Sequence, residues 1–248
     1  VLAKIVLEQV YMVVKKSHAI NQFPQEDIMK IYAINGGPRK KFNTAKLLQA
    51  ALGGAAAAPC SETVETEMIH LHDLNYKGCV SCFSCKRVGG KSYGHCAVKD
   101  DLAPVLEKLS QADGLIFGSP IYFGNVTGMM RSFLERLMFP FFVYDKDYSS
   151  LAPKRMPTAF IYPMNVSSEE MEQYGYLQNL KGMETFVGRL FGEPQVQHVH
   201  NTYQFDDYSK YKCERFSEPE KAAYRDAHFP QDLEQARRIG AAMVAAAR

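Results

Sequence analysis

The segment KIYAINGGPRKKFNT, residues 30–44, decides the fold and is the starting point for interpreting the rest of the chain. It predicts a strand at 30–34, and a helix is expected to begin at Thr44. Between them, Gly36 and Gly37 let backbone N–H groups approach an anion closely. The start of the helix adds unpaired N–H groups and a partial positive charge. The segment therefore predicts a strand–loop–helix unit with a cradle for a phosphate monoester.

Three side chains of this loop are suited to holding a phosphate. Arg39 can supply a charge-assisted hydrogen bond, and Asn43 and Thr44 are both donors and favoured N-cap residues. A plain strand-to-helix turn with a capping residue is the alternative explanation of the segment. Neither G-x-x-x-x-G-K-[ST] nor G-x-G-x-x-G follows the strand, which argues against nucleotide triphosphatases and dinucleotide-binding domains.

Strands and helices alternate along the rest of the chain with short turns between them. This alternation is typical of a parallel sheet covered by helices on both faces. The expected strands are 30–34, 67–71, 114–118, 158–162 and 196–199, and the expected helices are 44–52, 102–112, 127–138, 169–190 and 233–247. The sequence therefore predicts an α/β three-layer sandwich with a five-stranded parallel sheet.

Three segments lie outside this alternation. The Gly/Ala tract at 53–59 is expected to be a loop or a frayed helix end, and residues 201–230 a polar, aromatic insertion before the closing helix. Residues 1–28 are expected to be an N-terminal extension, either a genuine helix or sequence upstream of the natural start, because Met29 directly precedes the first strand. The domain is accordingly assigned to residues 29–248.

Composition argues against several classes of protein. The 248 residues carry a formal net charge of +2, with lysine and arginine scattered along the chain, so no nucleic-acid partner is indicated. The most apolar window, residues 1–14, is interrupted by Lys4 and Glu8, is too short to cross a membrane and lacks the features of a secretory signal. A cytoplasmic location and no membrane partner are therefore expected.

A second candidate ligand loop, SPIYFGNVTG at residues 119–128, follows the expected third strand. Ligands of open parallel sheets lie beyond the carboxyl ends of the strands, where this loop would be. Its aromatic faces suit a planar ring, although packing in the core is the alternative explanation. The candidate ring-binding residues are Ser119, Pro120, Ile121, Tyr122, Phe123, Gly124 and Asn125.

Together the motifs G-[GS]-P-R-K…N-T and S-P-I-Y-x-G-x-x-[TS] resemble those of the NADPH-dependent FMN reductase and multimeric flavodoxin superfamily, over about residues 29–144. The resemblance implies a flavodoxin-like fold and an FMN cofactor. By the same resemblance, Gly37, Arg39, Asn43 and Thr44 would hold the FMN phosphate, the stretch from Pro120 to Asn125 would contact the isoalloxazine, and Asn165 would lie at its other edge.

That family resemblance also implies an activity. An NAD(P)H co-substrate would reduce the flavin, which would then reduce a small acceptor such as a quinone, an azo dye or a free flavin. Because the cofactor carries this chemistry, no acidic or basic dyad is required of the protein. The resemblance further implies a homodimer or homotetramer.

Four of the six cysteines fall in one short loop: Cys79, Cys82, Cys85 and Cys96. This loop resembles that of the iron-sulfur flavoproteins in the same superfamily, which implies a 4Fe-4S cluster and an electron-transfer role with a ferredoxin-type partner. Four thiolates on one loop are also what such a cluster needs chemically. Free thiols, a zinc site and a redox dithiol remain open alternatives.

Histidine pairs and an aromatic run complete the set of candidates. His70 with His72 and His198 with His200 have strand spacing and are expected to be packed or solvated sheet residues. The aromatic-rich run at 203–211 is expected to be a surface loop, with a pocket roof in a neighbouring subunit as the alternative. No nucleophile-elbow sequence supports hydrolase chemistry.

Overall fold

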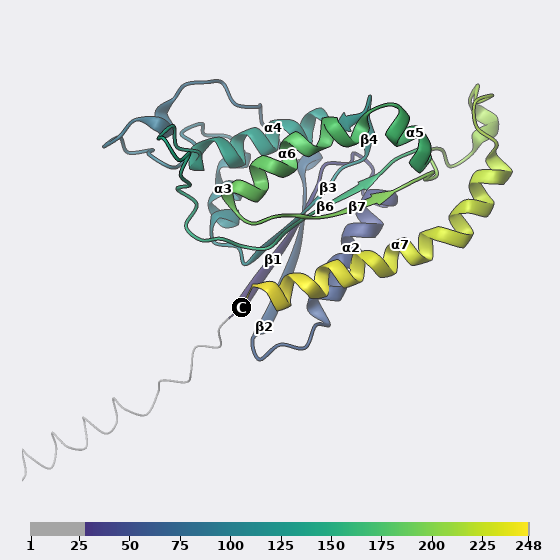
Figure 1. Ribbon diagram of the computed structural model, residues 1–248, viewed down its shortest axis with the longest axis horizontal. Helices are drawn as coiled ribbons and strands as arrows, with labels where there is room; N and C mark the ends of the chain where they lie inside the picture. Colours follow the sequence, from purple (N-terminus) through teal and green to yellow (C-terminus); the bar gives the residue numbers. More distant parts are fainter. Residues whose placement is uncertain (1–27, 248) are drawn as a thin grey trace, which may run out of the picture.

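The computed structural model describes residues 28–247, and its centre is a five-stranded sheet. All neighbouring strands are parallel, in the order β2-β1-β3-β6-β7 (Figure 1). The strands are β1 (Ile28–Asn35), β2 (Thr63–His70), β3 (Gly114–Gly118), β6 (Thr158–Pro163) and β7 (Gln195–Val199). The predicted five-stranded parallel sheet is confirmed.

Helices cover both faces of this sheet. One apolar core lies under α3, α4 and α6, and the other lies under α2 and α7 (Figure 1). The longer helices are α2 (Asn43–Ala56), α3 (Leu102–Ser110), α4 (Gly128–Met138), α5 (Ser168–Gln173), α6 (Tyr176–Leu190) and α7 (Glu218–Ala246). This is the expected flavodoxin-like three-layer sandwich.

Strand β3 lies at the middle of the sheet and is buried along its whole length. Its side chains alternate between the two cores, with Phe117 facing α4 and Ile116 facing α2 and α7. A Cβ added at Gly118 would lie 2.6 Å from Leu48 Cδ1, so the glycine lets α2 pack directly on the strand. The continuous apolar sequence of β3 follows from burial on both faces.

The Gly/Ala tract at 53–59, expected to be a loop or a frayed helix end, is helical as far as Ala56, where α2 ends. Its small residues serve the contact between α2 and α7. A Cβ at Gly54 would lie 2.0 Å from the Arg237 carbonyl oxygen, and one at Gly240 would lie 1.7 Å from the Ala51 carbonyl oxygen. Glycine at these positions allows the two helix backbones to touch.

Two other elements differ from expectation. The helix predicted at 169–190 is broken between α5 and α6, where Gly175 adopts a left-handed φ of 69°. Helix α7 begins at Glu218, much earlier than residue 233, and continues through Pro230. The segment without a long helix after β7 is therefore confined to residues 200–217.

The expected extension at residues 1–28 falls almost entirely outside the described residues. Of the helices that the structure describes, none is both long and apolar enough to span a bilayer.

Close contact between α2 and α7 predicts opposite effects for two glycine substitutions. Gly240→Ala should lower the free energy of unfolding by about 2 to 3 kcal/mol, because the new methyl group overlaps a backbone carbonyl of α2. Gly53→Ala, in the same contact region but with nothing within 4 Å of the added Cβ, should raise it by about 0.5 to 1 kcal/mol. Urea unfolding followed by circular dichroism measures both, and equal midpoints for Gly240→Ala and the unsubstituted protein would contradict the packing argument.

Candidate functional site

A pocket lies at the carboxyl ends of β1, β3 and β6. The loops that follow these three strands meet there with residues 202–204. The predicted site residues that line it are Gly37, Arg39, Asn43, Thr44, Pro120, Ile121, Tyr122 and Asn165. Residues that sequence reasoning missed also line it, namely Pro38, Phe42, Pro163, Met164, Thr202, Tyr203 and Gln204. The chain leaves β1 toward β2 on one side and later returns to β3 on the other, so the pocket opens at the topological switch point of the sheet.

The loop after β1 is fixed by hydrogen bonds from buried groups. The Gly36 amide donates to the Gly118 carbonyl over 2.8 Å, and the Gly37 amide donates to Asn35 Oδ1 over 2.8 Å. The buried Asn35 also donates through Nδ2 to His70 Nδ1 at 2.9 Å. Thr127 Oγ1, at the start of α4, donates to the Gly36 carbonyl over 2.8 Å. The loop is therefore held by three strands and one helix.

Helix α2 begins without a side-chain cap, in contrast to the expectation that Asn43 or Thr44 caps it. Phe42 is the N-cap residue and makes no capping hydrogen bond. The first N–H groups of α2 are therefore not closed by an N-cap side chain, which suits an anion. A Cβ at Gly37 would lie 3.2 Å from Thr44 Oγ1, so the glycine leaves room beside this helix end.

Arg39 and Asn43 each hold a segment that the sequence left as a surface loop. Arg39 Nη1 donates to the Gln204 carbonyl over 2.6 Å, and Asn43 Nδ2 donates to the Tyr203 carbonyl over 2.8 Å. The Arg39 guanidinium also lies 3.5 Å from the centre of the Phe42 ring. Residues 202–204, which we call the strap, thus cover the pocket of their own chain.

The sequence predicts a surface loop at residues 203–211, with a pocket roof in a neighbouring subunit as the alternative. Residues 203 and 204 instead line the pocket of their own chain, where Asn43 and Arg39 donate to their backbone carbonyls. Tyr203 of the strap is anchored from α7: the hydroxyl donates to Glu218 over 3.0 Å, and the Arg225 guanidinium lies 4.5 Å from the ring centre.

The loop after β3 divides into lining and supporting residues. Ile121 and Tyr122 form strand β4 (Ile121–Tyr122), which pairs with β5 (Asn125–Val126), and the half-exposed Tyr122 lines the pocket. Phe123 and Gly124 form the two-residue turn, with φ of 52° and 76°. Both residues, together with Asn125, lie away from the pocket lining.

Ser119 supports the loop from beneath and is also absent from the pocket lining. It is buried, and its Oγ donates to the Pro120 carbonyl over 2.9 Å and accepts from the Thr127 amide over 3.0 Å. Thr127 in turn caps α4 by accepting from the Met130 amide over 3.2 Å. Ser119 therefore positions the loop against α4.

Asn165 brings an unused acceptor to the far side of the pocket. Its Oδ1 is buried and has no hydrogen-bond partner among the described residues. Its backbone carbonyl accepts from Lys221 Nζ over 2.9 Å, and the same buried ammonium donates to Asn201 Oδ1 over 2.6 Å. Burial lowers the pKa of Lys221. Sequence reasoning missed this lysine, which sits in α7, far from any motif.

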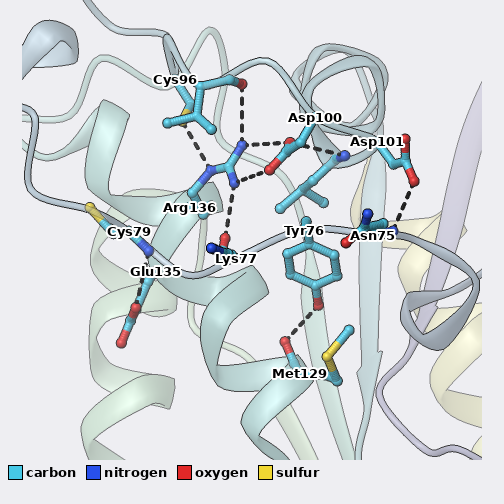
Figure 2. Close-up of polar contacts among 12 residues, drawn as sticks. Asn75, Tyr76, Lys77, Cys79, Cys96, Asp100, Asp101, Met129, Glu135 and Arg136 are labelled. Carbon is cyan, nitrogen blue, oxygen red and sulfur yellow. Dashed lines mark hydrogen bonds and ion pairs between the residues drawn. The ribbon is translucent and has the colours of Figure 1, made fainter.

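A second cavity collects the cysteines. Cys79, Cys82, Cys85 and Cys96 all line it, together with Arg136 of α4 and apolar residues that include Phe83 and Phe139. Figure 2 shows Cys96 next to the Arg136 guanidinium and Cys79 next to Glu135. The predicted metal-ligand candidates are thus brought to one place.

The environments of the four sulfurs differ. Cys82 lies between Ser81 and Phe83, whose φ values of 52° and 54° are unusual for residues other than glycine. Hydrogen bonds from the Ser84 backbone and side chain lower the pKa of Cys82, whereas burial raises the pKa of Cys85. Within residues 28–247, no three His, Cys, Asp or Glu side chains lie close enough together to hold one metal ion. The zinc alternative therefore gains no support.

The cysteine cavity and the pocket are two separate sites in the folded structure. Helix α4 reaches the pocket's loops with Thr127 and the cysteine cavity with Arg136, and its rise of 1.5 Å per residue separates these positions by about 14 Å. None of the four cysteines lines the pocket.

His198 in β7 and His200 directly after it are packed, as expected. His198 stacks on Tyr162 with 5.8 Å between ring centres, and His200 stacks on His198 at 6.2 Å. Burial lowers the pKa of both histidines.

Comparison with known proteins agrees with this fold. The chain resembles the NAD(P)H:quinone oxidoreductase of Methanothermobacter marburgensis with a TM-score of 0.61 and 15% identity, over 87% of this chain and 98% of that one. It resembles an azoreductase of Bacillus anthracis with a TM-score of 0.57 and 16% identity, over 86% and 99% of the two chains. Both comparisons place the chain in the flavodoxin-like class.

The profile of the NADPH-dependent FMN reductase family matches residues 29–169, and the chain belongs to this family. Curated relatives include an iron-sulfur flavoprotein of Methanocaldococcus jannaschii, 38% identical over 44% of this chain and 51% of the relative. Another, from Archaeoglobus fulgidus, is 41% identical over 44% of this chain and 48% of the relative. The matches thus span about half the length of these relatives.

Different sulfur environments predict an order of thiol reactivity in the reduced, metal-free protein. A thiolate is the nucleophile, so the lowered pKa and exposure of Cys82 should make it react with iodoacetamide before the buried Cys85 at pH 7. Ser84→Ala should slow Cys82 several-fold by removing the hydroxyl that favours its ionised form, while Ser92→Ala in the same loop should not. Peptide mass spectrometry gives the rates; faster labelling of Cys85 than of Cys82 would show the assignment to be wrong.

Proposed function

We propose that the chain is an FMN-dependent NAD(P)H oxidoreductase that reduces quinones, flavins or similar small acceptors. The observation that carries the proposal is the convergence of the loops after β1, β3 and β6 on one pocket at the switch point of the sheet. Membership of the NADPH-dependent FMN reductase family supports it. A homodimer or homotetramer and a cytoplasmic location, both expected from the sequence, stay predictions.

The pocket residues suit FMN in three respects. The uncapped start of α2, with Gly37 and Thr44 beside it, offers N–H and hydroxyl donors to a phosphate. The unpartnered Oδ1 of Asn165 can accept a hydrogen bond from an N–H group, such as that of the isoalloxazine. Tyr122, half exposed at the mouth, offers an aromatic face to a planar ring.

When bound, FMN would accept a hydride and pass electrons on. The residues of the chain would bind, orient and shield it. Gly37, Arg39, Asn43 and Thr44 are proposed to hold the phosphate end, and residues 120–122 the ring. Arg39 and Asn43 would also close the strap over the cofactor through the Gln204 and Tyr203 carbonyls. The strap would then exclude water from one side of the pocket.

A second candidate function is an iron-sulfur flavoprotein that exchanges electrons with a ferredoxin-type partner. Two observations favour it: several curated relatives carry that name, and Cys79, Cys82, Cys85 and Cys96 line a single cavity. A 4Fe-4S cluster takes one thiolate on each iron, so its ligands surround a body larger than one ion. The four cysteines are proposed as its ligands.

Variants of the phosphate loop test the FMN assignment. Arg39→Ala and Asn43→Ala should each weaken FMN binding about tenfold or more, because each removes a donor on which either the phosphate or the strap depends. Lys41→Ala is the matched control, since this lysine is exposed on the same loop but does not line the pocket. Quenching of flavin fluorescence measures the dissociation constants. Unchanged affinity in both variants would refute the phosphate assignment.

Visible spectroscopy separates the two candidate functions. Flavin bands alone, with NAD(P)H-dependent reduction of a quinone, would support the reductase. A broad additional absorbance after anaerobic reconstitution with iron and sulfide, lost in Cys79→Ala, would support the cluster. Cys213→Ala is the control, because this cysteine lies outside the cavity. A colourless protein that takes up neither FMN nor iron would exclude both candidates.

A further inference from the structure

Arg136 is the most deeply buried charged side chain at the cysteine cavity, with only 1% of its side chain exposed. Every N–H of its guanidinium has an acceptor nearby (Figure 2). Nε donates to Cys96 Sγ over 3.0 Å; Nη1 donates to Asp100 Oδ2 over 2.8 Å and to the Lys77 carbonyl over 3.0 Å; Nη2 donates to Asp100 Oδ1 over 3.0 Å and to the Val98 carbonyl over 3.4 Å.

These acceptors lie at the two ends of the cysteine loop. Lys77 precedes the first cysteine by two residues, and Val98 follows the last by two. Asp100 continues the network, since its Oδ1 also accepts from the Leu102 amide over 3.2 Å at the start of α3. Arg136 therefore joins both ends of the loop to α4 and, through Asp100, to α3.

One of these five donors is spent on a sulfur. A neutral thiol is a weak acceptor, whereas a sulfur with negative charge, such as a metal-bound thiolate, is a much better one. Asp100 already compensates one unit of charge, and Arg136 holds the pKa of that carboxyl below its usual range. The Nε–H group, which does not take part in the ion pair with Asp100, is therefore the donor to Cys96.

The charged residues around the cysteines also favour a negatively charged group at this site. Between Asp73 and Asp100 the sequence has no acidic residue, while it has the basic residues Lys77, Lys86, Arg87, Lys91 and Lys99. Lys86 is half buried, and its Nζ donates to the carbonyls of Phe139 and Phe142 behind the cavity. Glu135 is the acidic residue at the cavity wall, and its Oε2 accepts from the Cys79 amide at 3.4 Å. The loop is suited to a group with net negative charge.

We propose that Arg136 is a positioning residue of the cysteine site. It holds the Cys96 sulfur in place before any metal is bound, and it keeps a hydrogen bond to that sulfur once the sulfur is a ligand. The first part rests only on the geometry, and the second rests on the iron-sulfur function proposed above. Hydrogen bonds to ligand sulfurs are among the factors that set the reduction potential of an iron-sulfur cluster.

The test of the first part uses the full-length, reduced, metal-free protein. In Arg136→Lys, a single ammonium keeps the charge but cannot supply the five-donor fork. Iodoacetamide should then label Cys96 several-fold more slowly, because an N–H donor to sulfur favours the thiolate that reacts, and this donor is lost. Cys82, held by Ser84, and the distant Cys213 should keep their rates. Arg237→Lys, an exposed arginine paired with Glu234 on α7, is the control.

The pattern of labelling distinguishes positioning from general support of the fold. Slower labelling of Cys96 alone supports the proposal, whereas acceleration of both Cys82 and Cys96 shows that Arg136 only stabilises the loop and overturns it. An unchanged Cys96 rate also overturns it. If Arg136→Lys does not fold, Asp100→Asn replaces it, because this variant keeps the guanidinium but weakens its orientation; it should shift the Cys96 rate in the same direction.

The test of the second part uses protein reconstituted anaerobically with iron and sulfide. The midpoint potential should become more negative in Arg136→Lys. The hydrogen bond in the unsubstituted protein stabilises the reduced, more negatively charged state, and the variant loses it. Redox titration followed by electron paramagnetic resonance measures it, and an unchanged potential overturns this part. If the unsubstituted protein takes up no iron, the iron-sulfur function fails, while the labelling experiment still decides the role of Arg136 in the metal-free protein.

Discussion

The hydrogen bond from the Gly36 amide to the Gly118 carbonyl continues the pairing of β1 with β3 beyond the last residues of the ladder. It joins the two loops that face the pocket at the point where each leaves the sheet. A side chain at Gly36 would overlap Met130, and one at Gly118 would overlap Leu48, so the absence of side chains at these two glycines lets α4 and α2 pack closely on either side of the bond.

Helix α4 transmits that arrangement to the cysteine loop. At its first turn, Thr127 holds the Gly36 carbonyl, and more than two turns later Arg136 holds the ends of the cysteine loop. The side chains of Thr127 and Arg136 are buried, and their polar groups are fully hydrogen-bonded. Buried polar groups that are fully hydrogen-bonded hold one geometry, whereas unpaired ones destabilise the core. One helix therefore sets the separation between the two sites.

Much of the fold could be predicted because its signals are local. The glycine loop, the apolar strand at 114–118 and the alternation of elements each follow from a few neighbouring residues. The predictions failed where distant contacts decide the structure. The tract at 53–59 has the composition of a loop or a frayed helix end, yet α2 continues into it as far as Ala56, and Gly54 and Gly240 let the two helix backbones touch there. The closing helix is predicted only from residue 233, but α7 begins at Glu218 and passes through Pro230, and its later turns pack against α2 and the sheet. Of the predicted residues in the loop after β3, residues 120–122 line the pocket whereas Ser119 and residues 123–125 do not, and the strap was not among the predicted site residues.

The anchoring of the strap has a consequence for how the chain matures. The pocket joins a loop near residue 37 to Tyr203, whose ring is held by Glu218 and Arg225, and to Asn165, whose carbonyl is held by Lys221. During synthesis from the N-terminus, the glycine loop leaves the ribosome long before the first turns of α7. The strap therefore gains its contacts with Glu218 and Arg225 only after most of the chain has been made.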